Sequence, residues 1–412
     1  QWAKLAVYQF VLSIEKGQPW QWDDHGRLDV QRDEVRICLR ELARLARGRR
    51  NHGDCVNGLF HIDLYDESGV RQAILTDVHW LDYQIAVNKS GYISFEADAD
   101  ADALASLEPG WRVDVWRELP SGTLVKEAIG LVDELTWEYR DRAVLTVGAS
   151  GLMSLLGKRC VMWNANTANR SAFTAAKAET IAKTLVSYNI GASATAVNGR
   201  ILDGVNSLIS VQADAAGGNT LDWFCEWANL LETLQELAEV GGGDMDLVPV
   251  TGGYEFRWYA GQRGTDRSAT LLFALERGNI ANPRYVLSTV EMKNAVVVGG
   301  KGEDAERATA VVLSSEHTSA TQAEMFENAT DVETSDGLSD RGAAALEENK
   351  TVSAFSFDIL QTEACNFGVE YVLGDLVKAL NPFTNAAVTV KIESATVSYK
   401  SDGTLDIQIE VS

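Results

Sequence analysis

Alternating hydrophobic and polar residues run through most of the chain from residue 59 to the end. This alternation is typical of half-buried β-strands, because successive side chains of a strand point to opposite faces of a sheet. Turn residues separate the runs at short intervals, which favours a barrel or a sandwich. The predicted strands cover residues 59–65, 73–80, 82–87, 92–95, 111–116, 128–139, 143–147, 246–250, 254–259, 271–273, 295–299, 308–313, 352–360, 371–380, 388–400 and 405–411.

Other segments have apolar residues three or four positions apart, the spacing that places them on one face of a helix. The predicted helices cover residues 33–50, 151–160, 171–188, 221–240 and 338–349. The helix over 221–240 should end at the glycines 241–243, because glycine tolerates the left-handed conformation of a helix C-cap. These patterns together predict a β-rich α+β fold.

Two segments near opposite ends of the chain share one pattern. In each of them a strand begins near a glycine, a turn follows, and a long strand then leads through a tight turn into a return strand. The aligned pairs are Val132 with Ile392, Glu134 with Ser394, Trp137 with Val397, and Tyr139 with Tyr399. We therefore predict that the chain carries two copies of a small β unit.

The repeat and the distribution of helices predict four domains. Residues 1–55 form an N-terminal extension with a basic amphipathic helix, and residues 56–158 form a first β-barrel. Residues 159–350 form an α+β insertion, with helices over 171–188 and 221–240 followed by strands within 246–313. Residues 351–412 form a second β-barrel. The predicted fold class is thus two small β-barrels flanking an α+β insertion, with a helical extension before them.

Composition and charge exclude several classes of protein. Of 412 residues, 46% are hydrophobic, and the formal net charge is −23. So acidic a surface repels phosphate backbones and anionic lipid, which argues against nucleic-acid or membrane-surface binding. No apolar run reaches the roughly 18 residues of a membrane span. The five cysteines form no CxxC pair, so we expect reduced thiols in a protein folded in a cytoplasm, and we predict no signal peptide.

Candidate metal sites are weak in this sequence. Residues 98–102 alternate Asp and Ala like the start of a calcium loop, but the glycine and glutamate that an EF-hand needs further on are missing. The histidine–cysteine group lacks the short paired spacings of zinc sites. Its members are His52, Cys55, His61 and His79. We predict no catalytic residue, no metal site and no cofactor, and therefore no enzyme.

Two specific functions are also considered for this chain, one enzymatic and one in carbohydrate binding. Glu226, Glu232 and Glu236 could supply the acid and base of a cell-wall hydrolase acting on peptidoglycan or polysaccharide, with Trp223 and Trp227 as sugar platforms. The helical spacing of these tryptophans favours a core position instead. The second alternative is a carbohydrate-binding adhesin, because 11 tryptophans could mark a sugar-binding surface.

The order of several short motifs resembles the tail-hub (baseplate-hub, tail-associated) proteins of long-tailed, siphovirus-type bacteriophages and prophage elements. The motifs lie at residues 107–115, 129–135, 151–160, 338–346 and 369–377. The resemblance covers residues 56–412. It implies a structural virion protein of the tail tip, assembled in the bacterial cytoplasm, in which the two β units of each chain are equivalent.

The resemblance also implies partners. Three chains would form a ring of six β units, which joins the sixfold tail tube and distal tail protein on one side to the threefold tip, fibre or receptor-binding proteins on the other. Together with the repeat, it predicts residues at the contacts between units. These are Trp111, Val113, Tyr139, Gly374, Asp375 and Tyr399.

Overall fold

A computed structural model describes residues 59–99, 104, 107–164, 171–303, 306–330, 332, 334–362, 364–400 and 402–412. All of them belong to a unit that spans Cys55–Ser412. The predicted basic helix over 33–50 lies outside the described residues, as do His52, Cys55 and most of the acidic run at 98–102.

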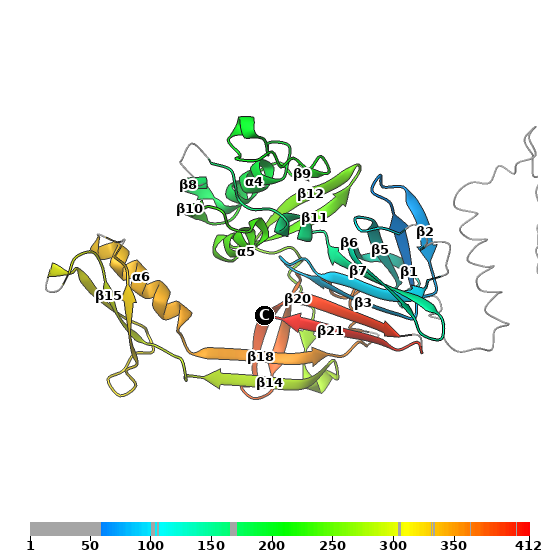
Figure 1. Cartoon of the computed structure of the whole chain (residues 1–412). Helices are drawn as coiled ribbons and strands as arrows, with labels where there is room; N and C mark the ends of the chain where they lie inside the picture. The colour runs from blue at the N-terminus through cyan, green and yellow to red at the C-terminus, as the bar shows by residue number, and fades with distance from the viewer. Residues whose placement is uncertain are drawn as a thin grey trace, which may run out of the picture. The chain divides into compact units, whose positions relative to one another are not determined.

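The main element is one sheet of eleven strands (Figure 1). Its order is β13-β19-β20-β3-β4-β7-β6-β5-β1-β2, and β21 pairs with β20 beside this path. The bounds are β1 Phe60–Tyr65, β2 Arg71–Leu75, β3 Trp80–Ala86, β4 Tyr92–Asp98, β5 Arg112–Glu118, β6 Leu124–Tyr139, β7 Ala143–Gly151, β13 Leu272–Phe273, β19 Leu376–Asn381, β20 Ala386–Lys400 and β21 Leu405–Val411.

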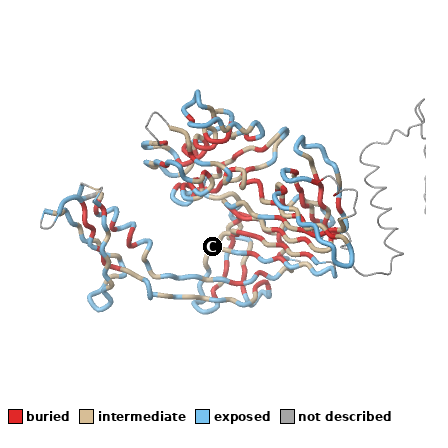
Figure 2. The backbone as a smooth tube through the Cα atoms, viewed as in Figure 1, coloured by how far each residue is buried: buried red, intermediate tan, exposed pale blue. Residues whose placement is uncertain are grey.

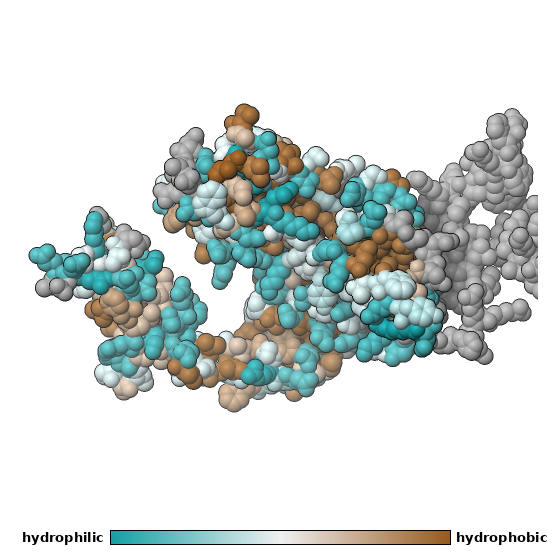
Figure 3. All heavy atoms as spheres, viewed as in Figure 1, coloured by the Kyte–Doolittle hydropathy of each residue, from teal (hydrophilic) through white to brown (hydrophobic). Residues whose placement is uncertain are grey.

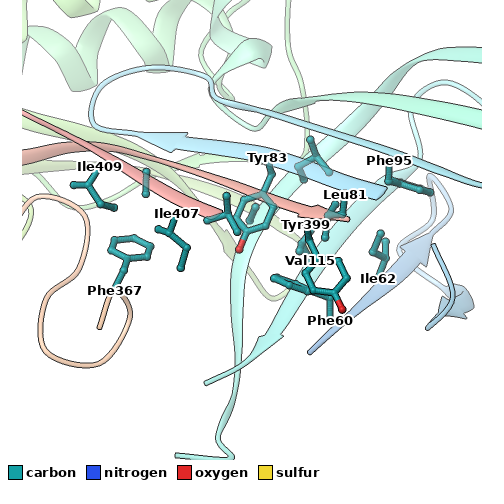
Figure 4. Close-up of a cluster of buried hydrophobic side chains, with 14 of the residues drawn as sticks. Phe60, Ile62, Leu81, Tyr83, Phe95, Val115, Phe367, Tyr399, Ile407 and Ile409 are labelled. Atoms are coloured by element: carbon teal, nitrogen blue, oxygen red, sulfur yellow. The ribbon is translucent and has the colours of Figure 1, made fainter. Parts of the chain in front are cut away.

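A single hydrophobic core lies against this sheet and draws on both ends of the chain. Buried side chains from β1, β3 and β5 meet side chains from β20 and β21, as Figure 4 shows. The ring of Phe60 packs edge-on against that of Tyr399, with 5.0 Å between their centroids. Residues more than 300 positions apart in the sequence thus share one interior.

The β-rich α+β class is confirmed, but the described strands form no closed barrel. The prediction of two separate barrels did not anticipate that β20 pairs with β3 from Ser394↔Ala86 to Lys400↔Trp80. This pairing joins the strands of both predicted barrel domains into one sheet. Local alternation predicts a strand, but not the neighbour with which it pairs.

The insertion between the two segments has its own core, built on two helices. Buried leucines, isoleucines and alanines of α4 and α5 pack against β11 and β12. The bounds are α3 Ser154–Gly157, β8 Ser171–Lys177, α4 Ala178–Asn189, η2 Ala196–Asn198, β9 Ile209–Val211, β10 Thr220–Cys225, α5 Leu230–Gly241, β11 Gly243–Val250 and β12 Gly253–Ala260.

Both long helices begin later than predicted. Residues 171–177 and 220–225 are not helical, because they pair with each other as the antiparallel strands β8 and β10. The Asn229 side chain caps α5 by accepting hydrogen bonds from the N–H groups of Leu231 and Glu232. The predicted stop is confirmed, since Gly242 adopts the left-handed conformation with φ 64°.

The rest of the described chain is a two-stranded ribbon and a small α/β module. β14 and β18 run side by side (Figure 1), while α6 packs on β15 and β16. The predicted pairing of the strands at 295–299 and 308–313 is confirmed. The bounds are η3 Leu275–Arg277, β14 Ile280–Ser288, β15 Ala295–Gly299, β16 Thr309–Leu313, β17 Glu324–Asn328, α6 Ser335–Glu348 and β18 Val352–Ile359.

Candidate assembly site

The two matching segments carry the same strands in the same chain order. In chain order, β3, β4, β5, β6 and β7 can be compared with β14, β18, β19, β20 and β21, although β15, β16, β17 and α6 lie between β14 and β18. The two sets also differ, because β4 pairs with β7 whereas β14 and β18 form a separate sheet. Within each set the long strand pairs antiparallel with the strand before it and with the strand after it. The first two strands of each set also pair antiparallel with each other.

The turns that precede β5 and β19 make the same backbone hydrogen bonds to the middle of the long strands β6 and β20. The Gly110 N–H donates to the Val132 carbonyl over 2.8 Å, and the Gly374 N–H donates to the Ile392 carbonyl over 2.9 Å. Both glycines have a positive φ, 97° and 86°. The return bonds run from Val132 N–H to the Trp111 carbonyl (2.8 Å) and from Ile392 N–H to the Asp375 carbonyl (3.0 Å).

Each long strand also has a bulge at the same place. The register shifts between Val132 and Glu134 in β6, and between Ile392 and Ser394 in β20. These are the residue pairs that the sequence alignment matches. A bulge sharpens the local bend and twist of a strand, so both segments bend at the same point.

The turn at Gly374 also corrects the prediction of one strand over 371–380, because β19 begins only at Leu376.

We expect Gly374→Ala to destabilise the protein by about 1–3 kcal/mol more than Gly403→Ala. Both glycines have φ 86°. A Cβ at Gly374 would lie 2.9 Å from the backbone nitrogen of Gly264, whereas one at Gly403 meets nothing within 4 Å. Urea unfolding of the two variants measures the difference, and equal losses would contradict it.

The predicted contact residues differ in exposure. Trp111, Val113 and Tyr399 are buried in the main core of the chain itself. Tyr139 is 70% exposed at the end of β6. Their roles at a contact between units stay predictions, and within one chain only Tyr139 of these four presents its side chain to solvent.

Asp375 has a structural role inside the chain. Its fully buried carboxylate accepts hydrogen bonds from the N–H groups of Thr265 (2.7 Å) and Val372 (3.0 Å). The Arg267 guanidinium donates a third at 2.6 Å. These bonds tie the turn at Gly374 to the loop before β13.

On the side that faces away from β7, the edge of β6 after the bulge has no partner strand among the described residues. Before the bulge β5 pairs with this edge, but its register stops at Leu131. Trp137 is 62% exposed, whereas its counterpart Val397 in β20 is fully buried. Sequence reasoning placed Trp137 in the repeat but missed its exposure. The only signal for it was a large aromatic residue where the other copy has valine.

A cavity of about 650 Å³ lies between β6, β11 and the loop before β19. Several charged side chains in its wall form ion pairs within the protein. Arg263 forms an ion pair with Asp246 at 2.8 Å, and Lys126 pairs with Asp114 at 2.6 Å. Burial raises the pKa of Asp246, although Arg263 opposes that shift. The charges therefore stabilise the wall of the cavity.

Asp244, which sequence reasoning also missed, connects the insertion to the main sheet. Its buried carboxylate accepts hydrogen bonds from Lys391 of β20 (3.0 Å) and from Asn88 in the β3–β4 turn (3.2 Å). Its other oxygen accepts the N–H of Arg263 at 2.8 Å. An isolated aspartate at the start of a strand gives no sequence signal for such a role.

The residues of the alternative functions lie on the insertion surface. Glu226 precedes α5, and Glu232 and Glu236 are exposed along it. Trp223 is partly buried against the insertion core, whereas Trp227 is 49% exposed. The helical spacing predicted for the two tryptophans is wrong, because Trp223 belongs to a strand and Trp227 to the turn after it.

Within the described part of the chain, no group of three His, Cys, Asp or Glu side chains is placed to hold a metal ion. His79 contacts two carboxylates, Glu96 at 3.0 Å and Asp98 at 3.1 Å. Cys160, Cys225 and Cys365 are free thiols, and burial raises the pKa of the latter two to about 11. No helix among the described residues is long and apolar enough to cross a bilayer.

Comparison with solved structures shows the same fold in tail proteins. The 43 kDa tail protein of prophage MuSo2 from Shewanella oneidensis is 15% identical, with a TM-score of 0.54 over 86% of this chain and 98% of that one. A tail protein from Neisseria meningitidis MC58 is 11% identical, with a TM-score of 0.52 over 86% and 97%.

A chain of the Francisella PdpA-VgrG complex is also similar. It is 9% identical, with a TM-score of 0.52 over 93% of this chain but only 56% of its own length. A comparison with curated proteins found no match.

The model of one protein family, described as Siphovirus ReqiPepy6 Gp37-like protein, matches residues 61–411. This range includes both copies of the five strands and the insertion between them. The chain shares its fold with prophage tail proteins. Because the family model matches most of the chain, the protein belongs to the Siphovirus ReqiPepy6 Gp37-like family.

Proposed function

We propose that this protein is the hub at the distal end of a phage tail, where three chains form a ring that joins the sixfold tail tube to the threefold tip or receptor-binding apparatus. A ring of three chains presents six similar β units if each chain contributes two. Such a ring meets sixfold symmetry on one face and threefold symmetry on the other.

The observation that carries the proposal is the matched backbone of the two segments. The N–H groups of Gly110 and Gly374 each donate a hydrogen bond to the long strand that follows. Both long strands have a bulge directly after the residue that accepts this bond. Two segments that bend alike can occupy equivalent positions around an axis.

The proposed role is assembly and not bond chemistry. In the cavity beside β6 and β11, Lys126 and Arg263 already form ion pairs with Asp114 and Asp246. The net charge of −23 opposes nucleic-acid binding by phosphate contacts. The partners proposed are other copies of this chain, the distal tail protein or tube, and tip, fibre or receptor-binding proteins.

Averaging images of tail-tip particles by electron microscopy tests this proposal. We expect a ring of six similar β units that come from three chains of this protein. A particle with one chain on the axis, or with β units of two dissimilar shapes, would contradict it. Cleavage of peptidoglycan by the purified protein, abolished in a Glu226→Gln variant, would instead support the hydrolase.

A further inference from the structure

The two long strands have the same bulge but different neighbours. After its bulge, β20 pairs on one side with β21 and on the other with β3, from Ser394 to Lys400. After its own bulge, β6 pairs only with β7 among the residues that the structure describes. The edge of β6 over residues 134–139 therefore leaves open the position that β3 fills beside β20. An unpaired strand edge offers a row of backbone donors and acceptors to another strand.

The side chains after the two bulges differ in exposure, being buried on β20 and exposed on β6. Val397 and Tyr399 are 0% and 2% exposed, and the aligned Trp137 and Tyr139 are 62% and 70% exposed. Tyrosine and tryptophan bury on the order of 150–250 Å² each when they are covered. The open stretch of β6 thus carries an aromatic pair that its counterpart keeps inside the core. Figure 2 shows that exposed and buried stretches alternate along the sheet, and Figure 3 shows apolar patches on the visible surface.

The structure also supplies a strand that fits this position. Beside β20 the occupant is β3, the first strand of the first set of five, and the first strand of the second set is β14. β14 pairs with β18 alone, in a two-stranded sheet. Its partner β18 contributes Phe357 and Ile359 to the main core, as β4 contributes Ile93 and Phe95. The outer edge of β14 is open among the described residues, as the outer edge of β3 would be without β20.

We propose that β14 of one chain pairs with residues 134–139 of β6 in a neighbouring copy of the same chain. The proposal rests on the proposed ring and names the contact that would build it. Such a contact is head-to-tail, since it joins two different surfaces, and repeated contacts of this type close into a ring when the rotation allows it. Pro283 has no N–H and a register shift surrounds it, so the pairing stretch of β14 is Arg284–Ser288.

The side chains of the two edges are complementary. Glu134 is exposed on β6, and Arg284 is exposed on β14. Leu287 of β14 is 62% exposed, so it can cover part of the aromatic pair on β6. Opposite charges and apolar contacts on facing strands each stabilise a sheet.

The first experiment measures the mass of the purified full-length chain by light scattering as a function of concentration. The wild type should form a trimer, and Trp137→Glu should shift its assembly to at least tenfold higher concentration. Phe224→Glu is the matched control, because Phe224 is also an exposed aromatic residue of a strand, 68% exposed on β10. It should assemble like the wild type. Unchanged assembly of Trp137→Glu would overturn the proposed pairing.

The second experiment mixes two single variants, Trp137→Cys and Leu287→Cys, and identifies disulfide-linked peptides by mass spectrometry after mild oxidation. A 137–287 link between chains is expected, while a Phe224→Cys and Leu287→Cys mixture should give none. Native cysteines do not confuse the result, because the linked peptides are identified. Scanning the second cysteine over residues 284–288 establishes the register.

The outcomes separate this inference from the proposed function. A trimer that resists Trp137→Glu and yields no link to residues 284–288 overturns the strand pairing, while the hub proposal stands. A chain that stays monomeric at every concentration also overturns the pairing, and tail-tip imaging then decides the hub independently. A trimer lost on Trp137→Glu together with the interchain link supports both.

Discussion

Replacing Arg117 with Met is expected to cost about 3–5 kcal/mol of stability, because it leaves a buried carboxylate without its partner. The guanidinium of Arg117 holds Glu127 through two hydrogen bonds of 2.8 and 2.5 Å, and both side chains are about 95% buried. It also donates to the Phe367 carbonyl at 2.8 Å. The Tyr83 hydroxyl donates to the same carboxylate.

This cluster joins the two ends of the chain. Arg117, Glu127 and Tyr83 belong to β5, β6 and β3, whereas Phe367 precedes β19. Burial raises the pKa of Tyr83 well above its usual range, and the charge of Glu127 adds to the shift. The Tyr83 hydroxyl is a hydrogen-bond donor to this carboxylate, and the charge of Glu127 depends on Arg117 for compensation.

Urea unfolding checks the size of this loss. Arg341→Met is the matched control, because Arg341 pairs with Glu327 at 3.0 Å while 49% of its side chain is exposed. Losing this exposed ion pair should lower the free energy of unfolding by less than about 1 kcal/mol. Combining Arg117→Met with Glu127→Leu should recover part of the stability, since the stranded charge is then gone. A loss for Arg117→Met no larger than that for Arg341→Met would contradict a stabilising role of the buried pair.

Glu179→Gln is expected to destabilise α4 by about 3–5 kcal/mol at neutral pH, because it strands the buried ammonium of Lys183. The two side chains form an i,i+4 ion pair with both about 5% exposed. Glu179 also accepts the N–H groups of Gly217 (2.6 Å) and Ala215 (3.2 Å). The pair thus holds the loop before β10 on the helix.

The effect should depend on pH in a defined direction. Burial by itself would raise the pKa of Glu179, but the hydrogen bonds from Lys183, Gly217 and Ala215 together lower it. A carboxyl with a lowered pKa stabilises the folded state above its unfolded pKa of about 4.3, and this contribution is lost as the pH falls through the lower folded value. The difference between wild type and Glu179→Gln should therefore shrink below pH about 4.

Hydrogen exchange of the α4 amides, followed by mass spectrometry, reports this local stability. The matched control is Glu347→Gln on α6, which removes an exposed ion pair with Lys350 just after this helix (71% and 61% exposed). That change should cost less than about 0.5 kcal/mol at every pH. A Glu179→Gln effect that stays constant down to pH about 3 would show that the carboxylate charge is not responsible.

Pattern reasoning identified most strands because their signal is local. Alternation located the hairpin of β11 and β12 and the strands β20 and β21 within a few residues. It failed for 171–177 and 220–225, where short apolar runs fit a helix as well as a strand. Those two segments are strands because each is the partner of the other, and a pairing between distant segments leaves no periodicity in either.

The candidate site shows the same division between local and non-local information. The alignment of Val132 with Ile392 came from the sequence, and the bulges and glycine turns coincide with it. The exposure of Trp137 could not be predicted from the sequence, because Trp137 and Val397 occupy equivalent places in their strands. Val397 is covered because β3 pairs with its strand.

The sequence by itself determined the β-rich class, the positions of most strands and the C-terminal end of α5, since these depend on side-chain alternation and on glycine at a left-handed backbone conformation. Only the tertiary structure decided that strands of both segments share one sheet and one core, that Arg117 and Glu179 are buried with their partners, and that the edge of β6 over residues 134–139 has no partner strand in the described part of the chain. These features depend on contacts between residues far apart in the chain, and such contacts are set by the packing of the whole fold.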